Sequence, residues 1–156
     1  MTKTLEQIAS DVRAAYSQGA TAGMGILGSL AADKIEIVHV PVHPRDGIWE
    51  GPTWAKAEHD SLKMLDQALI GFSQQLKSAD VVGDGLRTVT VLKGTLKDGT
   101  PLAHEVRTDL TLKHGKIVKS VAYTNWGSES GLLILKALGM NDFAKLAVQQ
   151  AAQQRT

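Results

Sequence analysis

Two histidines and one tyrosine are the residues of this chain best suited to moving protons. His39 and His104 each lie in a segment where apolar and polar residues alternate, so each is expected on the buried face of a β-strand. An unperturbed imidazole, with a pKa of about 6.5, suits a base that works near neutral pH. Tyr16 ends an amphipathic helical pattern, and a substrate oxygen would give a buried phenol its hydrogen-bond partner. We expect Tyr16, His39 and His104 to form a catalytic set at one apolar cavity. The alternative for each histidine is a structural residue bonded to backbone.

The segment 86–126 provides the sheet that would hold His104. It contains three β-runs separated by Asp98-Gly99 and His114-Gly115, and glycine at these places allows the positive φ of a tight hairpin turn. Asp109 is expected on the outer face, unless a bulge shifts the register by one residue. The alternation of the middle run predicts one buried face: Leu102, His104, Val106, Thr108, Leu110 and Leu112.

An amphipathic helix and a strand precede these three runs. Thr4 and Gln7 form a capping box for a helix over residues 4–18. Residues 34–40 alternate as a strand, which turns three side chains to one side: Ile35, Ile37 and His39. The remaining helices are expected in four places: about 20–31, from Pro52 onward, 128–138 and 141–152.

Two segments stay open at this stage. The third helix can stop at Gly71 or continue through Leu76, and residues 76–82 can equally form a strand. Residues 41–52, rich in Pro and Gly, form an irregular segment that is either a rim over the cavity or an ordinary surface loop. The side chains of interest in this segment are His43, Asp46, Trp49 and Glu50.

Two motifs that could indicate a bound cofactor or metal are rejected. Gly23–Gly28 matches GxGxxG, but a helix precedes it, and the position twenty residues after Gly23 is His43 where the motif needs an acidic residue. These glycines are instead expected to allow close helix packing. His39 and His43 have the spacing of an HxxxH pair, which brings two ligands together only on a helix, and Pro41 prevents one. We therefore expect neither a metal nor a cofactor.

Composition narrows the classes of function. The net charge of +1 gives no electrostatic basis for binding nucleic acid or an anionic membrane. The absence of cysteine rules out disulfides and thiolate chemistry. No run is long and apolar enough to span a bilayer, and the N-terminus lacks the apolar core of a signal peptide, so we expect a cytoplasmic protein.

The order of these pieces resembles the nuclear transport factor 2-like superfamily, in particular its SnoaL-like polyketide cyclases and ketosteroid isomerases. The resemblance covers residues 4–127. It rests on the helix ending near Tyr16, the strand IEIVHVP with its following loop, the hairpin GTLKDGTPL and the closing run HGKIVKSVAYTN. The last segment, with LKALGM, is loosely similar to phenazine-pathway members.

The resemblance implies a cone-shaped half-barrel, usually dimeric, with a deep apolar pocket, and it favours a strand at about 74–82. Tyr16 falls where the isomerases place a phenol that donates to an oxyanion. Their catalytic carboxylate falls at His39 or Val40, and a second acidic residue of these enzymes falls at Thr108. The phenol therefore matches, whereas both carboxylates are replaced.

We expect one domain over residues 1–156, with a core over 4–127 and a helical extension over 128–156. The expected fold is α+β, with a cone-shaped, curved antiparallel sheet wrapped around the N-terminal helices. The expected function is cofactor-free acid/base catalysis, of isomerase, cyclase, dehydratase or lyase type, on a small apolar carbonyl, phenolic or polycyclic compound. The alternative is a non-catalytic ligand-binding or protein-interaction domain. The expected substrate-binding residues are Trp49, Trp54, His59, Thr108, Thr124 and Trp126.

The second face of the sheet predicts self-association. Its apolar area is too large for a face exposed to water, so we expect a homodimer through it. The residues responsible are Val89, Val91, Val121 and Tyr123.

Overall fold

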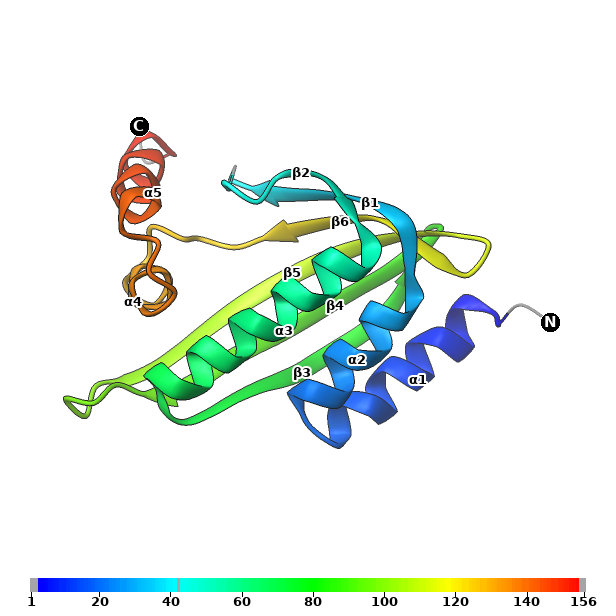
Figure 1. Cartoon of the computed structure of the whole chain (residues 1–156), viewed down its shortest axis with the longest axis horizontal. Coiled ribbons are helices and arrows are strands. Elements are labelled where there is room, and N and C mark those ends of the chain that lie inside the picture. The colour runs from blue at the N-terminus through cyan, green and yellow to red at the C-terminus, as the bar shows by residue number, and fades with distance from the viewer. Residues whose placement is uncertain (1–2, 42, 155–156) are drawn as a thin grey trace.

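The computed structural model describes residues 3–41 and 43–154, and its centre is a curved six-stranded sheet (Figure 1). Three helices lie over one face of this sheet: α1 (Leu5–Ser17), α2 (Ala20–Leu30) and α3 (Gly51–Ala68). Two further helices, α4 (Glu129–Ala137) and α5 (Asn141–Gln154), follow the last strand. The strands are β1 (Ala31–Val40), β2 (Gly47–Glu50), β3 (Ile70–Val82), β4 (Gly85–Thr95), β5 (Pro101–Lys113) and β6 (Lys116–Tyr123).

The sheet is mixed, with strand order β2-β1-β6-β5-β4-β3. β3 to β6 form the antiparallel meander that the sequence predicts. The expected curved antiparallel sheet has one exception, because β1 runs parallel to β6. A parallel pair needs a long crossover connection, and here α3 and the meander supply it.

The segment 41–52 was expected to be irregular, but it contains the short strand β2. β2 pairs antiparallel with β1, with Trp49 opposite Ile35. Four residues between a Pro-rich turn and a helix are too few to show alternation, so the pattern of apolar residues does not reveal this strand.

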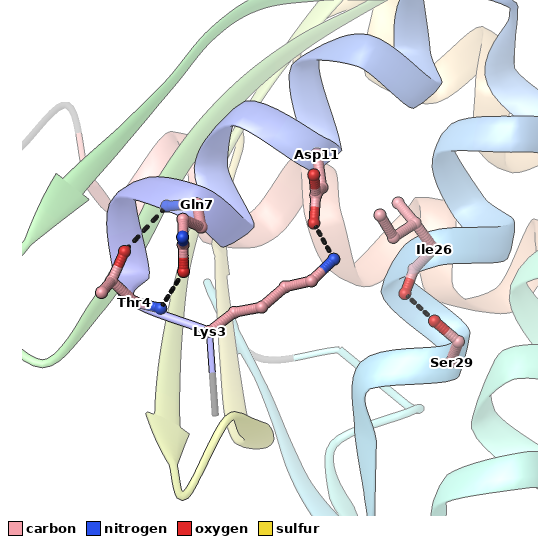
Figure 2. A network of polar contacts seen from close by, with 6 residues as sticks. All are labelled: Lys3, Thr4, Gln7, Asp11, Ile26 and Ser29. Carbon is pink, nitrogen blue, oxygen red and sulfur yellow. Dashed lines mark hydrogen bonds and ion pairs between the residues drawn. The ribbon is translucent and has the colours of Figure 1, made fainter. Parts of the chain in front are cut away.

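The N-terminal helix begins with the capping box that the sequence predicts (Figure 2). The Gln7 amide N–H donates to Thr4 Oγ1 at 3.1 Å, and the Thr4 N–H donates to Gln7 Oε1 at 2.8 Å. Lys3 Nζ donates to Asp11 at 2.5 Å on the exposed side of the helix. The capping box thus fixes the first residue of α1. On the opposite side of the helix Ile8, Val12 and Tyr16 are buried, so the last turn of α1 packs into the core.

The glycines of α2 allow close packing, as expected. A Cβ on Gly23 would lie 2.5 Å from Cδ1 of the Tyr16 ring, and one on Gly28 would lie 3.0 Å from Ala55 Cβ. Gly23 thus lets α2 approach the aromatic ring that ends α1.

The choice left open after α3 resolves as a strand. α3 ends at Ala68, and β3 starts at Ile70, about four residues earlier than the strand suggested by the resemblance. Gly71, which was a possible helix end, lies within this strand at φ 65°.

The middle strand, β5, has the face pattern that its alternation predicts. Leu102, His104, Leu110 and Leu112 are buried on the inner face. Asp109 lies on the outer face, where its carboxylate accepts from Arg87 Nε at 2.8 Å. The two hairpin turns contain Gly99 at φ 91° and Gly115 at φ 75°. The register therefore contains no shift that would turn Asp109 inward.

The two C-terminal helices pack against each other. Ser128 caps α4, because its Oγ accepts the Gly131 N–H at 3.1 Å. Buried residues of α4 and α5 form a small core of their own: Leu135, Phe143, Ala144 and Ala147. Among the helices of residues 3–41 and 43–154, none is long and apolar enough to cross a membrane.

Candidate functional site

A cavity of about 180 Å³ lies between the inner face of the sheet and the helices. Apolar side chains form much of its wall, including Met24, Leu27, Ile37, Leu65 and Leu110. Threonine and serine hydroxyls from the strands add polar points to the wall. Five titratable or charged side chains also line it: Tyr16 from α1, His39 from β1, His43 and Arg45 from the loop after β1, and Glu58 from α3.

His39 is held by a carboxylate. Its Nδ1 lies 2.7 Å from Asp46 Oδ1, and Asp46 Oδ2 accepts the backbone N–H of His43 at 3.3 Å. A carboxylate can only accept, so Nδ1 carries the proton and Nε2 has the free lone pair. Burial lowers the pKa of His39, although the hydrogen bond to Asp46 opposes this shift. The neutral imidazole near pH 7 can therefore act as a base, and Asp46 would stabilise the imidazolium that forms.

His43 stays neutral in the folded protein. Its Nδ1 accepts the Arg45 N–H at 3.0 Å, and its ring stacks on His39 with 4.4 Å between centroids. The Phe143 ring meets the His43 ring in a T-shaped arrangement, with 4.7 Å between centroids. Burial, with smaller contributions from His39 and Arg45, lowers the pKa of His43 to about 3. His43 therefore packs against His39 as an uncharged aromatic ring at neutral pH.

Tyr16 is the phenol that the sequence predicts at this cavity. Only 8% of its surface is exposed, and within the described part of the chain its hydroxyl has no hydrogen-bond partner. Burial first, and then the charge of Glu58, raises the pKa of Tyr16 to about 12. The phenol thus keeps its proton at neutral pH and can donate it to a hydrogen bond with a bound oxygen.

Glu58 was not expected at the site. It is partly buried, and burial raises the pKa of its carboxyl group, with a smaller opposing effect from Arg45. Arg45 itself donates from Nη1 to Ser61 Oγ at 2.9 Å. The signal for Glu58 was present in the sequence, because it lies four residues after Trp54 and four before Leu62, on the apolar stripe of α3.

His104 is buried on the predicted face but does not join the catalytic set. Its Nε2 lies 2.7 Å from Thr124 Oγ1, and its Nδ1 lies 2.8 Å from Ser130 Oγ. Thr124 Oγ1 donates its own proton to the Glu105 carbonyl at 2.8 Å, so it accepts the Nε2 proton of His104. His104 is also absent from the described residues that line the cavity. The structure does not bring His104 to the cavity of His39, as was expected, because its two ring nitrogens bond elsewhere, Nε2 to Thr124 and Nδ1 to Ser130 of α4.

The six expected substrate-binding residues divide evenly. Trp54, Thr108 and Trp126 line the cavity. Thr124 bonds to His104 and Glu105, and the indole N–H of Trp49 donates to the Arg45 carbonyl at 2.8 Å. His59 lies in a separate outer groove. Thr124, Trp49 and His59 are therefore not cavity-lining residues, because each side chain bonds or lies outside the cavity.

Two buried polar atoms at the cavity have no partner in the described part of the chain. They are Gln74 Oε1, an acceptor, and Trp126 Nε1, a donor. An unpaired buried polar atom costs about 1–3 kcal/mol, so a ligand that satisfied either one would gain that amount back.

The outer groove, of about 940 Å³, lies between the end of α1, α3 and β3. Tyr16, Leu62 and Gln74 line both this groove and the inner cavity. These three residues therefore separate the cavity from the groove.

A metal site was not expected from the sequence. Among residues 3–41 and 43–154 no three His, Asp, Glu or Cys side chains gather closely enough to hold an ion. Nδ1 of His39 bonds to Asp46, and Nδ1 of His43 accepts the Arg45 N–H.

Comparison with solved structures identifies the fold. A nuclear transport factor 2-like protein from Burkholderia thailandensis matches with a TM-score of 0.61 at 21% identity, over 87% of this chain and 98% of that one. A protein from Mesorhizobium loti described as a SnoaL-like polyketide cyclase matches with a TM-score of 0.59 at 20% identity, over 78% and 99%. A ketosteroid isomerase-like protein from Catenulispora acidiphila, solved with trimethylamine, matches with a TM-score of 0.55 at 20% identity, over 83% and 92%.

No family model matches the chain, and no curated protein matches it in sequence. The structural matches nevertheless agree, and the chain has the α+β, nuclear transport factor 2-like fold to which SnoaL-like and ketosteroid isomerase-like proteins also belong. This confirms the resemblance drawn from the sequence at the level of fold.

Proposed function

We propose that this protein is a cofactor-free enzyme that catalyses proton transfer on a small apolar carbonyl or phenolic compound. The observation that carries the proposal is the Asp46–His39 pair, 2.7 Å apart, at the wall of an apolar cavity. Asp46 fixes the tautomer of His39, which leaves Nε2 as a base, and Tyr16 offers a phenolic proton to the same cavity. Isomerisation, cyclisation, dehydration and lyase chemistry all begin with such a step.

The step proposed is removal of a proton from carbon next to a carbonyl group. His39 Nε2 takes the proton, and the electron pair of the C–H bond moves toward the carbonyl oxygen. Tyr16 donates a hydrogen bond to that oxygen as negative charge develops on it. Asp46 then faces an imidazolium across a charge-assisted hydrogen bond, which is stronger than a neutral one.

The size of the cavity restricts the substrate. Pockets that bind drug-sized ligands usually measure about 300–1,000 Å³. A cavity of about 180 Å³ favours one or two rings over the larger polycyclic compounds that the resemblance allowed.

The test is hydrogen–deuterium exchange at the α-carbon of a small ketone. 2-Tetralone in D₂O, with EDTA present, should lose its α-proton signals faster with the protein than without it, as measured by proton NMR. His39→Ala should slow the catalysed exchange by about 10²–10⁴, the usual contribution of a general base. His114→Asn, in an exposed turn at φ 52°, is the matched control and should exchange like the parent.

Two results would contradict the proposal. Equal exchange by the parent and His39→Ala would remove His39 as the base. Exchange that occurs only when EDTA is left out, or that returns only when zinc is added, would show that the chemistry needs a metal.

A non-catalytic ligand-binding protein is the second candidate. The unpaired Gln74 Oε1 and Trp126 Nε1 favour it, because either can hold a ligand without chemistry. The trimethylamine bound to the Catenulispora protein also supports small-molecule binding within this fold. If 2-tetralone changes the tryptophan fluorescence of this protein but no catalysed exchange occurs, binding without catalysis is the better description.

A further inference from the structure

Glu58 is a carboxylate that the interactions of the folded chain leave unexplained. It lies on α3 and lines the cavity, yet none of residues 3–41 and 43–154 gives its carboxyl group a hydrogen bond or an ion pair. Other carboxylates of the chain are paired, such as Asp60 on the same helix with Lys56 at 2.8 Å and Asp109 with Arg87. Burying a carboxyl group without a partner lowers stability, so its presence in an apolar wall suggests a ligand that it binds.

Glu58, Tyr16 and His39 reach the cavity from three different elements, α3, α1 and β1. The charge of Glu58 contributes to the raised pKa of Tyr16, and Arg45 influences the pKa of both Glu58 and His39. A ligand in this cavity therefore meets Glu58 and Tyr16 as well as His39.

We propose that Glu58 is a second proton carrier of the cavity, which binds and protonates an oxygen of the substrate while His39 acts on carbon. The inference rests on the proposed function for its catalytic step. It also names the substrate class more narrowly: a ketone of one or two rings with an acidic C–H group next to its carbonyl.

The proton balance of the step is complete without another reactant. The proton of the C–H bond goes to His39 Nε2, and the C–H electron pair forms the new C=C bond. The C=O π pair moves to oxygen, which takes the proton of the Glu58 carboxylic acid and becomes an enol hydroxyl. Return of a proton from imidazolium to the same carbon, and of the enol proton to Glu58, gives back the ketone and restores both groups. In D₂O the returned proton is a deuteron, which the exchange assay detects.

This step requires His39 neutral and Glu58 protonated, so the catalysed rate should have a bell-shaped dependence on pH. The acid side would follow His39, whose pKa is lowered by burial, and the alkaline side Glu58, whose pKa burial raises. The other ionisable groups that face Glu58 across the cavity are Tyr16, His43 and Arg45. α2 contributes no titratable side chain, and the facing strand residues are neutral: Gln74, Thr88, Thr90, Thr108 and Ser120.

The first experiment is the 2-tetralone exchange measured across pH. Glu58→Gln should lower the rate by about 10² and should lose the alkaline side of the profile, because an amide cannot deliver a proton. Asp60→Asn removes a carboxylate from the exposed side of the same helix and should leave both rate and profile as in the parent. Glu58→Asp, which keeps the acid but shortens its reach, should be slow with the alkaline side retained.

The outcomes separate this inference from the proposed function. If the parent exchanges and Glu58→Gln keeps the full rate and the alkaline side, Glu58 is not a proton carrier while the role of His39 stands. If Glu58→Gln fails to fold, Glu58→Asp decides, and a parental rate in that variant overturns the inference.

If the parent does not catalyse exchange at all, binding of 2-naphthol decides instead, in a His39→Ala background where that imidazole cannot titrate. Affinity should rise as Glu58 ionises, because a carboxylate accepts the naphthol O–H more strongly than a neutral acid does. That rise should be missing when Glu58→Gln is added. Equal binding by both variants at every pH would show that Glu58 contacts no ligand oxygen.

Discussion

Single side chains of the loop after β1 control the charge at the cavity. Asp46 holds His39 through one carboxylate oxygen and the His43 backbone N–H through the other. Arg45 donates its backbone N–H to His43 and its guanidinium to Ser61. These residues of one loop therefore set the tautomers of both imidazoles, and the bond from Arg45 to Ser61 attaches the loop to α3.

His43 predicts a specific dependence of stability on acid. Its pKa is about 3 in the folded protein and about 6.5 when unperturbed, so the unfolded chain binds more protons between these values. The free energy of unfolding should thus be complete above pH 6.5 and should fall as pH drops toward 3. His43→Asn removes the titrating ring, while its side-chain oxygen can still accept the Arg45 N–H two residues on.

Urea unfolding at pH 7, 6, 5 and 4 checks this prediction. The variant should be less stable than the parent at pH 7, since it loses ring contacts with His39 and Phe143, but it should lose less stability on acidification. His114→Asn, in the exposed turn, should lose as much as the parent. Parallel curves for the parent and His43→Asn would mean that His43 does not resist protonation.

The sequence predicts side-chain faces well and side-chain partners poorly. Alternation placed His39 and His104 on the inner face, and the helical stripe placed Tyr16 there, because faces follow from a fixed period. Whether His104 is free depended on Ser130, which lies 26 residues further along the chain and approaches only when α4 folds back. Glu58 lies on the apolar stripe of α3, yet a lone charged residue in a helix is usually solvated. Only the structure shows that Glu58 lines the cavity.

Most helices and strands were predictable from local sequence signals. The pairing of strands that lie far apart in the sequence was not. Caps at Thr4 and Ser128 and the turns at Gly99 and Gly115 are local signals, and all four are present. The parallel pairing of β1 with β6 joins segments about eighty residues apart, and no local pattern reports which strands become neighbours.

The approach of α2 to α1 gives a test with an internal control. Gly25 lies on the exposed side of α2 and a Cβ there would meet nothing within 4 Å, so Gly25→Ala should stabilise the protein by about 0.5–1 kcal/mol through helix propensity. Gly23→Ala gains the same propensity, but its Cβ would lie 2.5 Å from the Tyr16 ring. It should therefore lower the free energy of unfolding and shift Tyr16.

Chemical unfolding and the exchange assay measure the two effects together. Gly25→Ala should keep the parental exchange rate, whereas Gly23→Ala should reduce it because Tyr16 no longer reaches the substrate oxygen. Stabilisation by both substitutions to the same degree would show that the Tyr16 ring moves aside without cost.

The outer face of the sheet determines how the whole molecule is expected to associate. Val89, Val91, Val121 and Tyr123 are half-buried on the face opposite the helices. The Arg107 guanidinium lies 4.2 Å from the Tyr123 ring centroid, and its Nε is buried without a hydrogen-bond partner in the described chain. A second copy of the chain could cover the valines and offer an acceptor to Arg107, so we expect a homodimer through this face.

Val121→Lys is the substitution that separates association from folding. Val121 pairs across the strands with Asp109, so a lysine there meets a carboxylate within its own chain and should leave the monomer folded. In a dimer the same lysine would be buried at the interface, where removing a charge from water is costly even beside a carboxylate. Sedimentation equilibrium at micromolar concentration should give a dimer for the parent and a monomer for Val121→Lys.

Val148→Lys replaces an exposed valine of α5, at 49% exposure, and should stay dimeric. A parent that sediments as a monomer at these concentrations would remove the proposed interface. A dimer that survives Val121→Lys but not Val148→Lys would move it to the C-terminal helices.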